Sequence, residues 1–249
     1  MKSDGELAAV LARDAGRLLM GLRQADDDRD RAGARGDASS NALLIRRLGA
    51  ERPMDSVLSE EAVDDLARLS AERVWIIDPL DGTREYAEGR PDWAVHVALW
   101  ERGEFACGAV ALPAFNAVRH TEAPEPLPVR MGRIRIAVSR SRPPAFVDDL
   151  ARRLDAELVP MGSAGVKAMS VISGQVDAYV HAGGQYEWDS AAPVAVARAS
   201  GLVTCRLDGS PLLYNQADPM LPDLVIAHPD VFVDVMAAVG EILAEVGVA

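Results

Sequence analysis

Hydrophobic positions near the start of the chain repeat every three or four residues, as they do along one face of a helix. This face is formed by Leu7, Leu11, Ala15, Leu18, Leu19 and Leu22. Residues 24–36 break the pattern because they are charged, polar and glycine-containing, and we expect a mobile loop there. Asp37 follows, just before the apolar residues Leu43, Leu44 and Leu48. We therefore expect Asp37 near the start of a second helix, where an aspartate commonly caps the first turn.

Short apolar runs then predict a series of strands. They cover residues 56–58, 74–77, 93–100 and 105–112. In the third run Trp93, Val95, Val97 and Leu99 alternate with smaller or polar residues, which is typical of a half-buried strand. Arg102-Gly103 then forms the tip of a hairpin between the third and fourth strands.

A connector with three prolines, at residues 124–128, leads to a strand at residues 134–138. The expected order after that strand is a helix from about Pro144, a helix from about Ser163, a strand at 178–180, a helix after Asp189, a strand at 224–226 and a helix from Asp230. This alternation predicts an α/β chain with α+β character, layered as an αβαβα sandwich. We expect an N-terminal α+β half at residues 1–122 and a C-terminal α/β half at residues 132–249.

Composition narrows the class of protein. Asp and Glu outnumber Lys and Arg by 38 to 26, and the net charge of −12 argues against binding nucleic acid. With 49% hydrophobic residues the chain is globular. No apolar run is long enough to cross a membrane, the first residues lack a signal-peptide pattern, and Cys107 and Cys205 imply no disulfide framework, so we expect a cytoplasmic protein.

The strongest chemical signal is the turn Asp78-Pro79-Leu80-Asp81-Gly82-Thr83, which follows an apolar strand. Proline and glycine favour a tight turn, which can aim both carboxylates at one point beside the threonine hydroxyl. Hard divalent cations such as Mg²⁺ prefer oxygen ligands of this kind. The same residues could also form an ordinary turn.

Two further acidic segments could also supply oxygen ligands for a metal ion. Glu60-Glu61 comes after a predicted strand, and Asp189 lies at the head of a predicted helix. Taken alone, the glutamates could begin a solvated helix and Asp189 could be a helix cap. Taken together and in this order, the acidic residues favour a metal site.

This series of residues, with Asp37 and Trp188-Asp189, resembles the metal-dependent, lithium-sensitive phosphatases of the inositol monophosphatase superfamily. The resemblance implies the αβαβα sandwich of inositol monophosphatases and fructose-1,6-bisphosphatases. It also implies hydrolysis of a phosphomonoester by metal-activated water, with two or three Mg²⁺ ions per site and inhibition by Li⁺. The implied metal ligands are Glu60, Asp78, the Leu80 carbonyl, Asp81 and Asp189. The implied catalytic residues are Asp37 and Thr83, which orient and deprotonate the water, and Glu61.

Arg84-Glu85-Tyr86 and the run from Gly162 to Lys167 resemble the 3′(2′),5′-bisphosphate nucleotidase (CysQ-like) branch of this superfamily. The implied substrate-binding residues are Gly82, Thr83, Ser139, Arg140, Ser141, Arg142, Gly162, Ser163, Ala164, Lys167 and Tyr214. Backbone N–H groups at the helix start after Ser163 can face an anion, although this segment could also be a plain helix cap. Related nucleotidases tend to have histidine where Arg142 stands. Tyr214 could equally be a buried residue after a turn.

The resemblance implies a small phosphorylated nucleotide as substrate: 3′-phosphoadenosine 5′-phosphate, its sulfated form, or both, in sulfur assimilation. Alternatives are an inositol monophosphatase or a fructose-1,6-bisphosphatase, and a non-catalytic Mg²⁺- or nucleotide-binding protein, which would not need the Asp37–Thr83 pair. We expect no nucleic-acid or membrane partner, and the sequence leaves open whether the chain forms a homodimer. None of the four histidines shows a catalytic pattern, and we interpret all four as bystanders. A final hypothesis is that the loop at residues 24–36 closes over the site.

Overall fold

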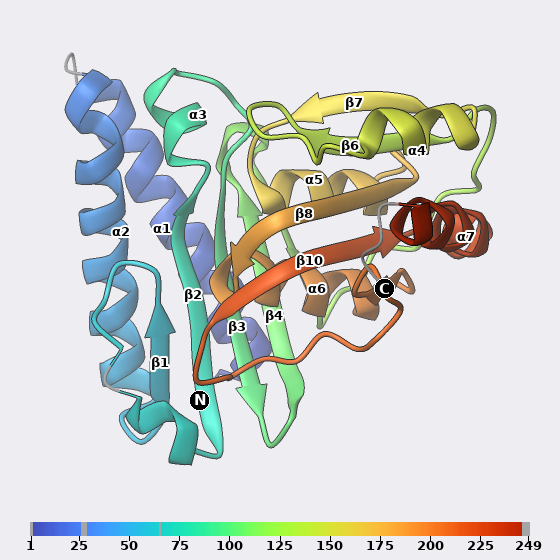
Figure 1. Cartoon of the computed structure of the whole chain (residues 1–249). Helices are drawn as coiled ribbons and strands as arrows, with labels where there is room; N and C mark the ends of the chain where they lie inside the picture. The colour runs from blue at the N-terminus through green and yellow to red at the C-terminus, as the bar shows by residue number, and fades with distance from the viewer. Residues whose placement is uncertain (1, 26–28, 65, 246–249) are drawn as a thin grey trace.

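The computed structural model describes residues 2–25, 29–64 and 66–245. Within them the chain folds into five layers, which confirms the predicted αβαβα sandwich (Figure 1). Helices α1 (Asp4–Ala25) and α2 (Arg29–Glu51) cover the outer face of a first sheet. Helices α5 (Ala164–Ile172) and α6 (Glu187–Ala199) lie between the two sheets, and α4 (Val147–Arg153) and α7 (Pro229–Glu245) cover the outer face of the second.

The first sheet holds the strands of the N-terminal half in sequence order. They are β1 (Ser56–Ser59), β2 (Arg73–Asp81), β3 (Ala94–Glu101), β4 (Glu104–Leu112) and β5 (Ala117–His120). β1 runs parallel to β2, and the remaining neighbours are antiparallel. The short helix α3 (Thr83–Ala87) follows β2, and single 3₁₀ turns, η1 (Ala67–Ser70) and η2 (Pro113–Phe115), precede β2 and β5.

The second sheet is formed after the proline connector and has the order β7-β6-β8-β10-β9. Its strands are β6 (Arg135–Ser139), β7 (Glu157–Met161), β8 (Ala178–Tyr186), β9 (Val203–Cys205) and β10 (Met220–Ala227). β6, β7 and β8 are parallel, whereas β10 is antiparallel to both of its neighbours. The sequence pattern did not reveal the short strands β5, β7 and β9.

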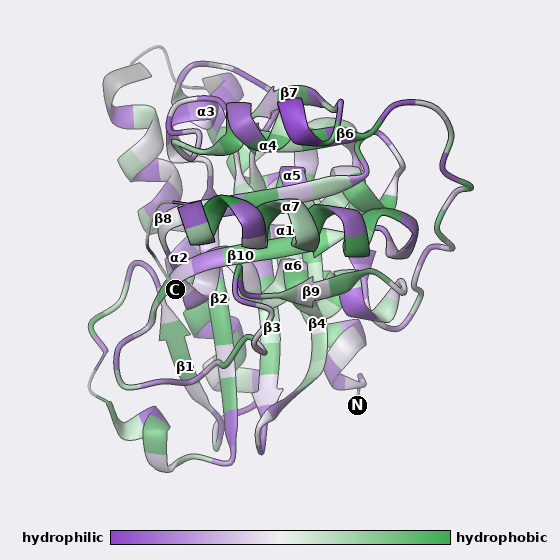
Figure 2. Ribbon diagram, turned by 45° about the vertical axis from the view of Figure 1, so that its right-hand side comes forward, coloured by the Kyte–Doolittle hydropathy of each residue, from purple (hydrophilic) through white to green (hydrophobic). Residues whose placement is uncertain are grey.

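Alternation along the strands explains the layering, because successive side chains point to opposite faces of a sheet. In β2, Trp75 and Ile77 pack against α1 and α2, while Val74 and Ile76 pack into the core shared by both sheets with α5 and α6. Figure 2 shows β2, β3 and β4 as largely hydrophobic. β3 is therefore buried on both faces, and the prediction of a half-buried strand at residues 93–100 was wrong: its smaller residues face helices, not water.

The predicted loop at residues 24–36 was also wrong where the structure describes it. Residues 24–25 end α1, residues 29–36 belong to α2, and residues 26–28 lie outside the described part of the chain. Asp37 is consequently inside a helix and not at its start. The reason is tertiary packing, which overrides local polarity: Gly36 lies so close to Leu19, Leu80 and Tyr86 that a Cβ there would approach each within 3.1–3.2 Å.

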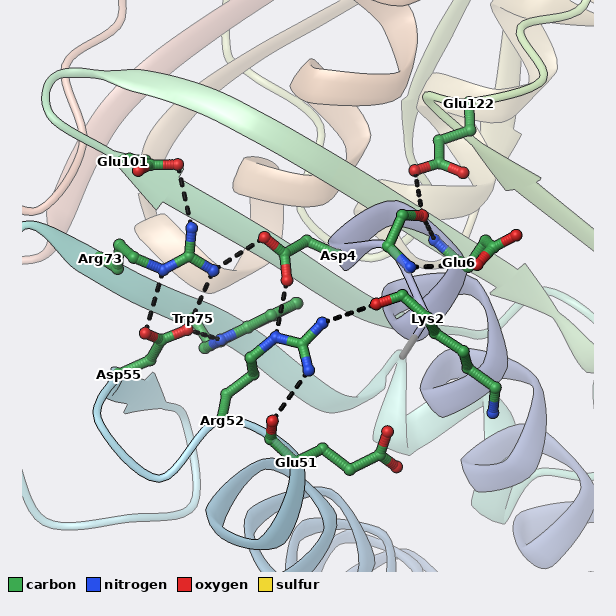
Figure 3. A network of polar contacts seen from close by, with 11 residues as sticks. Lys2, Asp4, Glu6, Glu51, Arg52, Asp55, Arg73, Trp75, Glu101 and Glu122 are labelled. Atoms are coloured by element: carbon green, nitrogen blue, oxygen red, sulfur yellow. Dashed lines mark hydrogen bonds and ion pairs between the residues drawn. The ribbon is translucent and has the colours of Figure 1, made fainter.

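An ion-pair network ties the end of the first sheet to the first helix (Figure 3). Arg73, at the start of β2, pairs with Asp55, Asp4 and Glu101 at 2.8–3.0 Å, and Arg52 pairs with Asp4 at 2.7 Å. We call these five residues the arginine network. Among the described helices, none is both long enough and apolar enough to cross a membrane.

Candidate active site

The site begins where β1 and β2 end. Because these strands are parallel, their carboxyl ends lie at the same edge of the sheet, and the residues that follow them come together. Glu60 follows β1. Asp78 and Asp81 lie at the end of β2, and Asp81 is its last residue. Gly82 has φ +88°, a left-handed conformation that glycine adopts without strain, and it redirects the chain into α3.

Asp189 reaches the same point from the other half of the chain. It is the third residue of α6, so it is not the N-cap residue itself, and its carboxylate accepts a hydrogen bond from the Tyr186 N–H at 2.6 Å. One carboxylate oxygen each from Asp78, Asp81 and Asp189 lies within 4.8 Å of the others. With Glu60, which lines the same cavity, we call these residues the carboxylate pocket.

The charges of this pocket repel one another in the absence of a cation. Burial, together with Glu60 and Asp81, raises the pKa of Asp78 well above its ordinary value. Burial and the neighbouring Asp189 raise the pKa of Glu60 to about 7. Burial and Asp81 likewise raise the pKa of Asp189 to about 6. Such shifts indicate carboxylates that lack positive partners.

These residues fit a divalent metal ion. The donors are carboxylate oxygens, two of the three clustered aspartates are buried, and in the described part of the chain no Lys or Arg forms an ion pair with Asp78 or Asp189. A hard cation with oxygen ligands would supply the charge that the protein does not. The Leu80 carbonyl also lies here, accepting a hydrogen bond from the Thr83 hydroxyl at 3.1 Å.

Asp37 and Thr83 form a pair beside the carboxylate pocket. The Thr83 hydroxyl lies 3.3 and 3.5 Å from the two carboxylate oxygens of Asp37. Burial and the charge of Glu61 raise the pKa of Asp37 to about 7. The carboxyl of Asp37 can therefore accept or hold a proton near neutral pH, at an oxygen that the threonine hydroxyl also touches.

Asp81 occupies the N-terminus of α5. It accepts hydrogen bonds from the Ser163 hydroxyl, from Ala164 N at 3.1 Å and from Gly165 N at 2.7 Å. Burial by itself would raise the pKa of Asp81, but His96, Lys167 and Ser163 lower it to about 2. Our expectation that these N–H groups face a substrate anion was therefore wrong: they bind a carboxylate of the protein.

His96, in β3, was wrongly interpreted as a bystander. The ring is fully buried, with Nδ1 3.1 Å from the Trp188 carbonyl oxygen and Nε2 3.2 Å from Asp81. His96 thus joins the acidic turn of the first sheet to the start of α6. The sequence held one indication of this role. His96 shares a face of its strand with Ala94 and Ala98, and a polar side chain buried among such residues needs a hydrogen-bond partner.

A cavity of about 380 Å³ opens over the carboxylate pocket. It is lined by most of the residues implied by the resemblance, namely Glu60, Asp78, Leu80, Asp81, Gly82, Thr83, Ser139, Ser141, Arg142, Gly162, Ser163, Ala164, Lys167 and Asp189. Eight other residues also line it. The sequence analysis named Arg84, Glu85 and Trp188 only as part of the resemblance, and it gave no role to Tyr179, His181, Gly184, Gln185 and Tyr186. The cavity therefore lies between the two halves of the chain.

Lys167 and His181 bring nitrogen atoms to this cavity. Lys167 is buried, which lowers its pKa, and its Nζ donates to the Ser163 carbonyl at 2.6 Å. Burial and the charge of Lys167 lower the pKa of His181 to about 4. His181 lines the cavity, and our interpretation of this histidine as a bystander stays a prediction.

Four predicted site residues lie outside the cavity lining. Asp37 sits behind Thr83, and Glu61 is exposed but acts on Asp37 through its charge. Arg140 pairs with Glu85 and Glu88 at 2.8 and 2.9 Å. Tyr214 is buried beneath α6, where its hydroxyl lies 3.1 Å from Ser190 Oγ, which matches the alternative that it is a core residue.

Comparison with known proteins agrees with this geometry. A sequence model described as the inositol monophosphatase family matches residues 7–231. The chain is 54% identical over 243 residues to a protein of Mycobacterium bovis named 3′-phosphoadenosine 5′-phosphate phosphatase, covering 92% of this chain and 90% of that protein. A protein of the same name from Mycobacterium leprae is 50% identical, with 96% and 94% covered. The crystal structure of CysQ from Bacteroides thetaiotaomicron superposes with a TM-score of 0.78 at 25% identity, covering 89% of this chain and 96% of that one.

Proposed function

The chain belongs to the inositol monophosphatase family, and from this premise we propose that it removes the 3′-phosphate of 3′-phosphoadenosine 5′-phosphate. The sulfated form of this nucleotide is a second substrate of the same kind, and both would place the enzyme in sulfur assimilation. The relatives that are 50–54% identical carry the name of this activity.

The observation that carries the proposal is the convergence of three aspartates beside the Asp37–Thr83 pair. A protein that only bound a nucleotide would need the first feature but not the second. Asp78, Asp81 and Asp189, with Glu60 and the Leu80 carbonyl, would hold Mg²⁺, and Li⁺ would inhibit by competing for one of these positions. When bound, Mg²⁺ neutralises the phosphoryl oxygens and lowers the pKa of water.

The residues of the chain then position and deprotonate the nucleophile. The Thr83 hydroxyl orients a water molecule and takes a proton from it while passing its own proton to the Asp37 oxygen that lies 3.3 Å from Thr83 Oγ1. Burial and the charge of Glu61 keep the pKa of Asp37 raised to about 7, which suits a base that works near neutral pH. No Cys, Ser or His needs to act as a nucleophile, so no phosphoenzyme is expected.

A second phosphate distinguishes the nucleotide from simple phosphomonoesters. Arg84, Arg142 and the buried Lys167 line the cavity. A guanidinium can bind a phosphate through two hydrogen bonds. These cations support a bisphosphate as substrate in a chain whose net charge is −12.

The test is phosphate release from a panel of substrates. The panel holds 3′-phosphoadenosine 5′-phosphate, its sulfated form, inositol 1-phosphate and fructose 1,6-bisphosphate, each assayed with and without Mg²⁺ and with added Li⁺. We expect kcat/KM to be highest for the two nucleotides, with activity lost in chelator. Higher kcat/KM for inositol 1-phosphate would contradict the proposed substrate, and no release from any substrate would contradict the enzyme.

A further inference from the structure

The cations of the cavity, together with a metal ion held by its carboxylates, could bind the two phosphates of the proposed substrate. They do not explain how its adenine base would be bound. A nucleobase presents a flat π face, and proteins commonly bind it by stacking an aromatic side chain on it. Beside the His181 imidazole, the described lining of the cavity holds three aromatic side chains: Tyr179, Tyr186 and Trp188.

Tyr179 cannot offer a free face to a ligand. Its side chain is fully buried, and its hydroxyl accepts a hydrogen bond from Gln185 Nε2 at 2.8 Å. Lys167 Nζ lies 5.2 Å from the centre of its ring. This tyrosine is therefore part of the floor that holds Lys167 in place.

Tyr186 and Trp188 form a stacked pair at the junction of β8 and α6. Their ring centres are 4.8 Å apart and the ring planes are inclined by only 7°. Trp188 is the inner residue of the pair, because it is partly buried and packs against the core between the two sheets, and its backbone carbonyl oxygen lies 3.1 Å from His96 Nδ1. The pair therefore has a fixed inner ring and an outer ring.

The outer ring is the accessible one. Tyr186 is 46% exposed although one of its faces lies against Trp188, so its exposed area falls on the opposite face and on the hydroxyl edge. Its own backbone N–H binds Asp189, which ties the position of this ring to the carboxylate pocket. Among the described residues Trp188 is the one ring that contacts Tyr186, so the opposite face of the tyrosine, in the lining of the cavity, is open to a ligand.

We propose that Tyr186 is the platform on which the nucleobase of the substrate stacks, and that it is thereby a specificity-determining residue. The inference rests on the proposed function, because it concerns how the same cavity selects a nucleotide. Inositol phosphates and sugar bisphosphates lack an aromatic face, so the Tyr186 ring stabilises only the base-containing substrates. Stacking on an aromatic side chain contributes about 1–3 kcal/mol per base, which is roughly a 5- to 150-fold effect on binding.

The experiment compares Tyr186→Ala with Tyr186→Phe on two matched substrates. One is 3′-phosphoadenosine 5′-phosphate, and the other is ribose 3,5-bisphosphate with no base. We expect Tyr186→Ala to raise KM for the nucleotide about tenfold with kcat changed less than about twofold, and to leave KM for the substrate without a base within about twofold. Tyr186→Phe keeps the π face and should behave as the unmodified chain on both substrates.

Binding is measured independently with the 2-aminopurine analogue of the nucleotide, whose fluorescence is quenched when its base stacks. We expect strong quenching in the unmodified chain and in Tyr186→Phe, and weak quenching at saturation in Tyr186→Ala. Phe115, an exposed ring in η2 away from the cavity, provides the control variant Phe115→Ala, which should change none of these values.

An equal rise of KM for both substrates in Tyr186→Ala would overturn the inference, because a loss of structure affects them alike. An unchanged KM for the nucleotide would overturn it as well. If the unmodified chain fails to hydrolyse the nucleotide, the proposed function is wrong, and the fluorescence measurement still decides whether Tyr186 stacks on the base.

Discussion

Acidic clusters lie at both ends of strand β2, and they differ in whether Arg or Lys side chains pair with their carboxylates. At its start, the carboxylates of the arginine network have guanidinium partners within 3.0 Å. At its end, the carboxylate pocket brings Asp78, Asp81 and Asp189 within 4.8 Å of one another, and no Lys or Arg pairs with Asp78 or Asp189 in the described chain.

The pKa values follow this difference. Burial by itself would raise the pKa of Asp4, but Arg73 and Arg52 hold it below its ordinary value. Burial and like charges raise the pKa of Glu60 and Asp189 to about 7 and about 6. A carboxylate with a fixed guanidinium partner needs no further charge, whereas Asp78 and Asp189, which pair with no Lys or Arg, could take a cation from outside. The comparison therefore assigns structure to one end of the strand and chemistry to the other.

The largest effect should come from Asp81→Asn. Removing this charge weakens the cation site and disturbs the turn that positions Thr83, so kcat/KM for 3′-phosphoadenosine 5′-phosphate should fall at least about 1,000-fold. The asparagine side chain keeps an oxygen that can accept the hydrogen bond from Ala164 N, so circular dichroism and the Tm should show a folded protein. Activity within tenfold of the unmodified chain would remove Asp81 from the site.

Asp37→Asn should have the next largest effect. An amide cannot take the proton that Asp37 accepts beside Thr83, so we expect kcat to fall about 100- to 1,000-fold. KM and the Mg²⁺ concentration for half-maximal activity should change little, because Asp37 does not line the cavity. A variant that lost Mg²⁺ affinity while keeping kcat would show that Asp37 is a metal ligand and not a base.

The same aspartate-to-asparagine change at the other end of β2 should give the opposite result. Asp55 accepts hydrogen bonds from Arg73 and from Trp75 Nε1 (Figure 3), and its side chain is only 8% exposed. Asp55→Asn should lower the free energy of unfolding by about 1–3 kcal/mol and leave kcat within about twofold. Urea unfolding and the phosphate-release assay measure the two effects, and a loss of activity without a loss of stability would break the comparison.

The tight turn predicted that Asp78 and Asp81 aim at one point, because turns are local features, and the resemblance implied Glu60 and Asp189 as further metal ligands. The structure brings Asp78, Asp81 and Asp189 together, with Glu60 in the lining of the same cavity. His96 and Tyr186 were missed, since their roles depend on Trp188 and on neighbours in other elements. The helical residues 29–36 were mistaken for a loop for a similar reason: their local composition is polar, but Gly36 is packed against α1 and α3.

The smallest expected effect is a pH dependence that should separate the two clusters. Groups whose pKa is raised on folding favour the folded state at low pH, and this contribution is lost as pH rises through the folded pKa. On folding, the pKa of Asp37 and of Glu60 rises from the ordinary carboxyl range to about 7, and that of Asp189 to about 6, so the metal-free protein should lose stability between about pH 4 and 7. Asp4 adds no slope there, because its lowered pKa stabilises the fold at all pH values above its ordinary range.

We expect the Tm in chelator to fall by at least about 3 °C from pH 5.5 to pH 8, which corresponds to roughly 1 kcal/mol in a chain of this size. Mg²⁺ should raise the Tm more at pH 8 than at pH 5.5, since it binds the ionised carboxylates and the folded state only. Glu60→Gln should reduce the slope in chelator, whereas Asp55→Asn should lower the Tm equally at both pH values. A Tm in chelator that stays constant or rises from pH 5.5 to pH 8 would mean that the carboxylate pocket is not strained by its own charge.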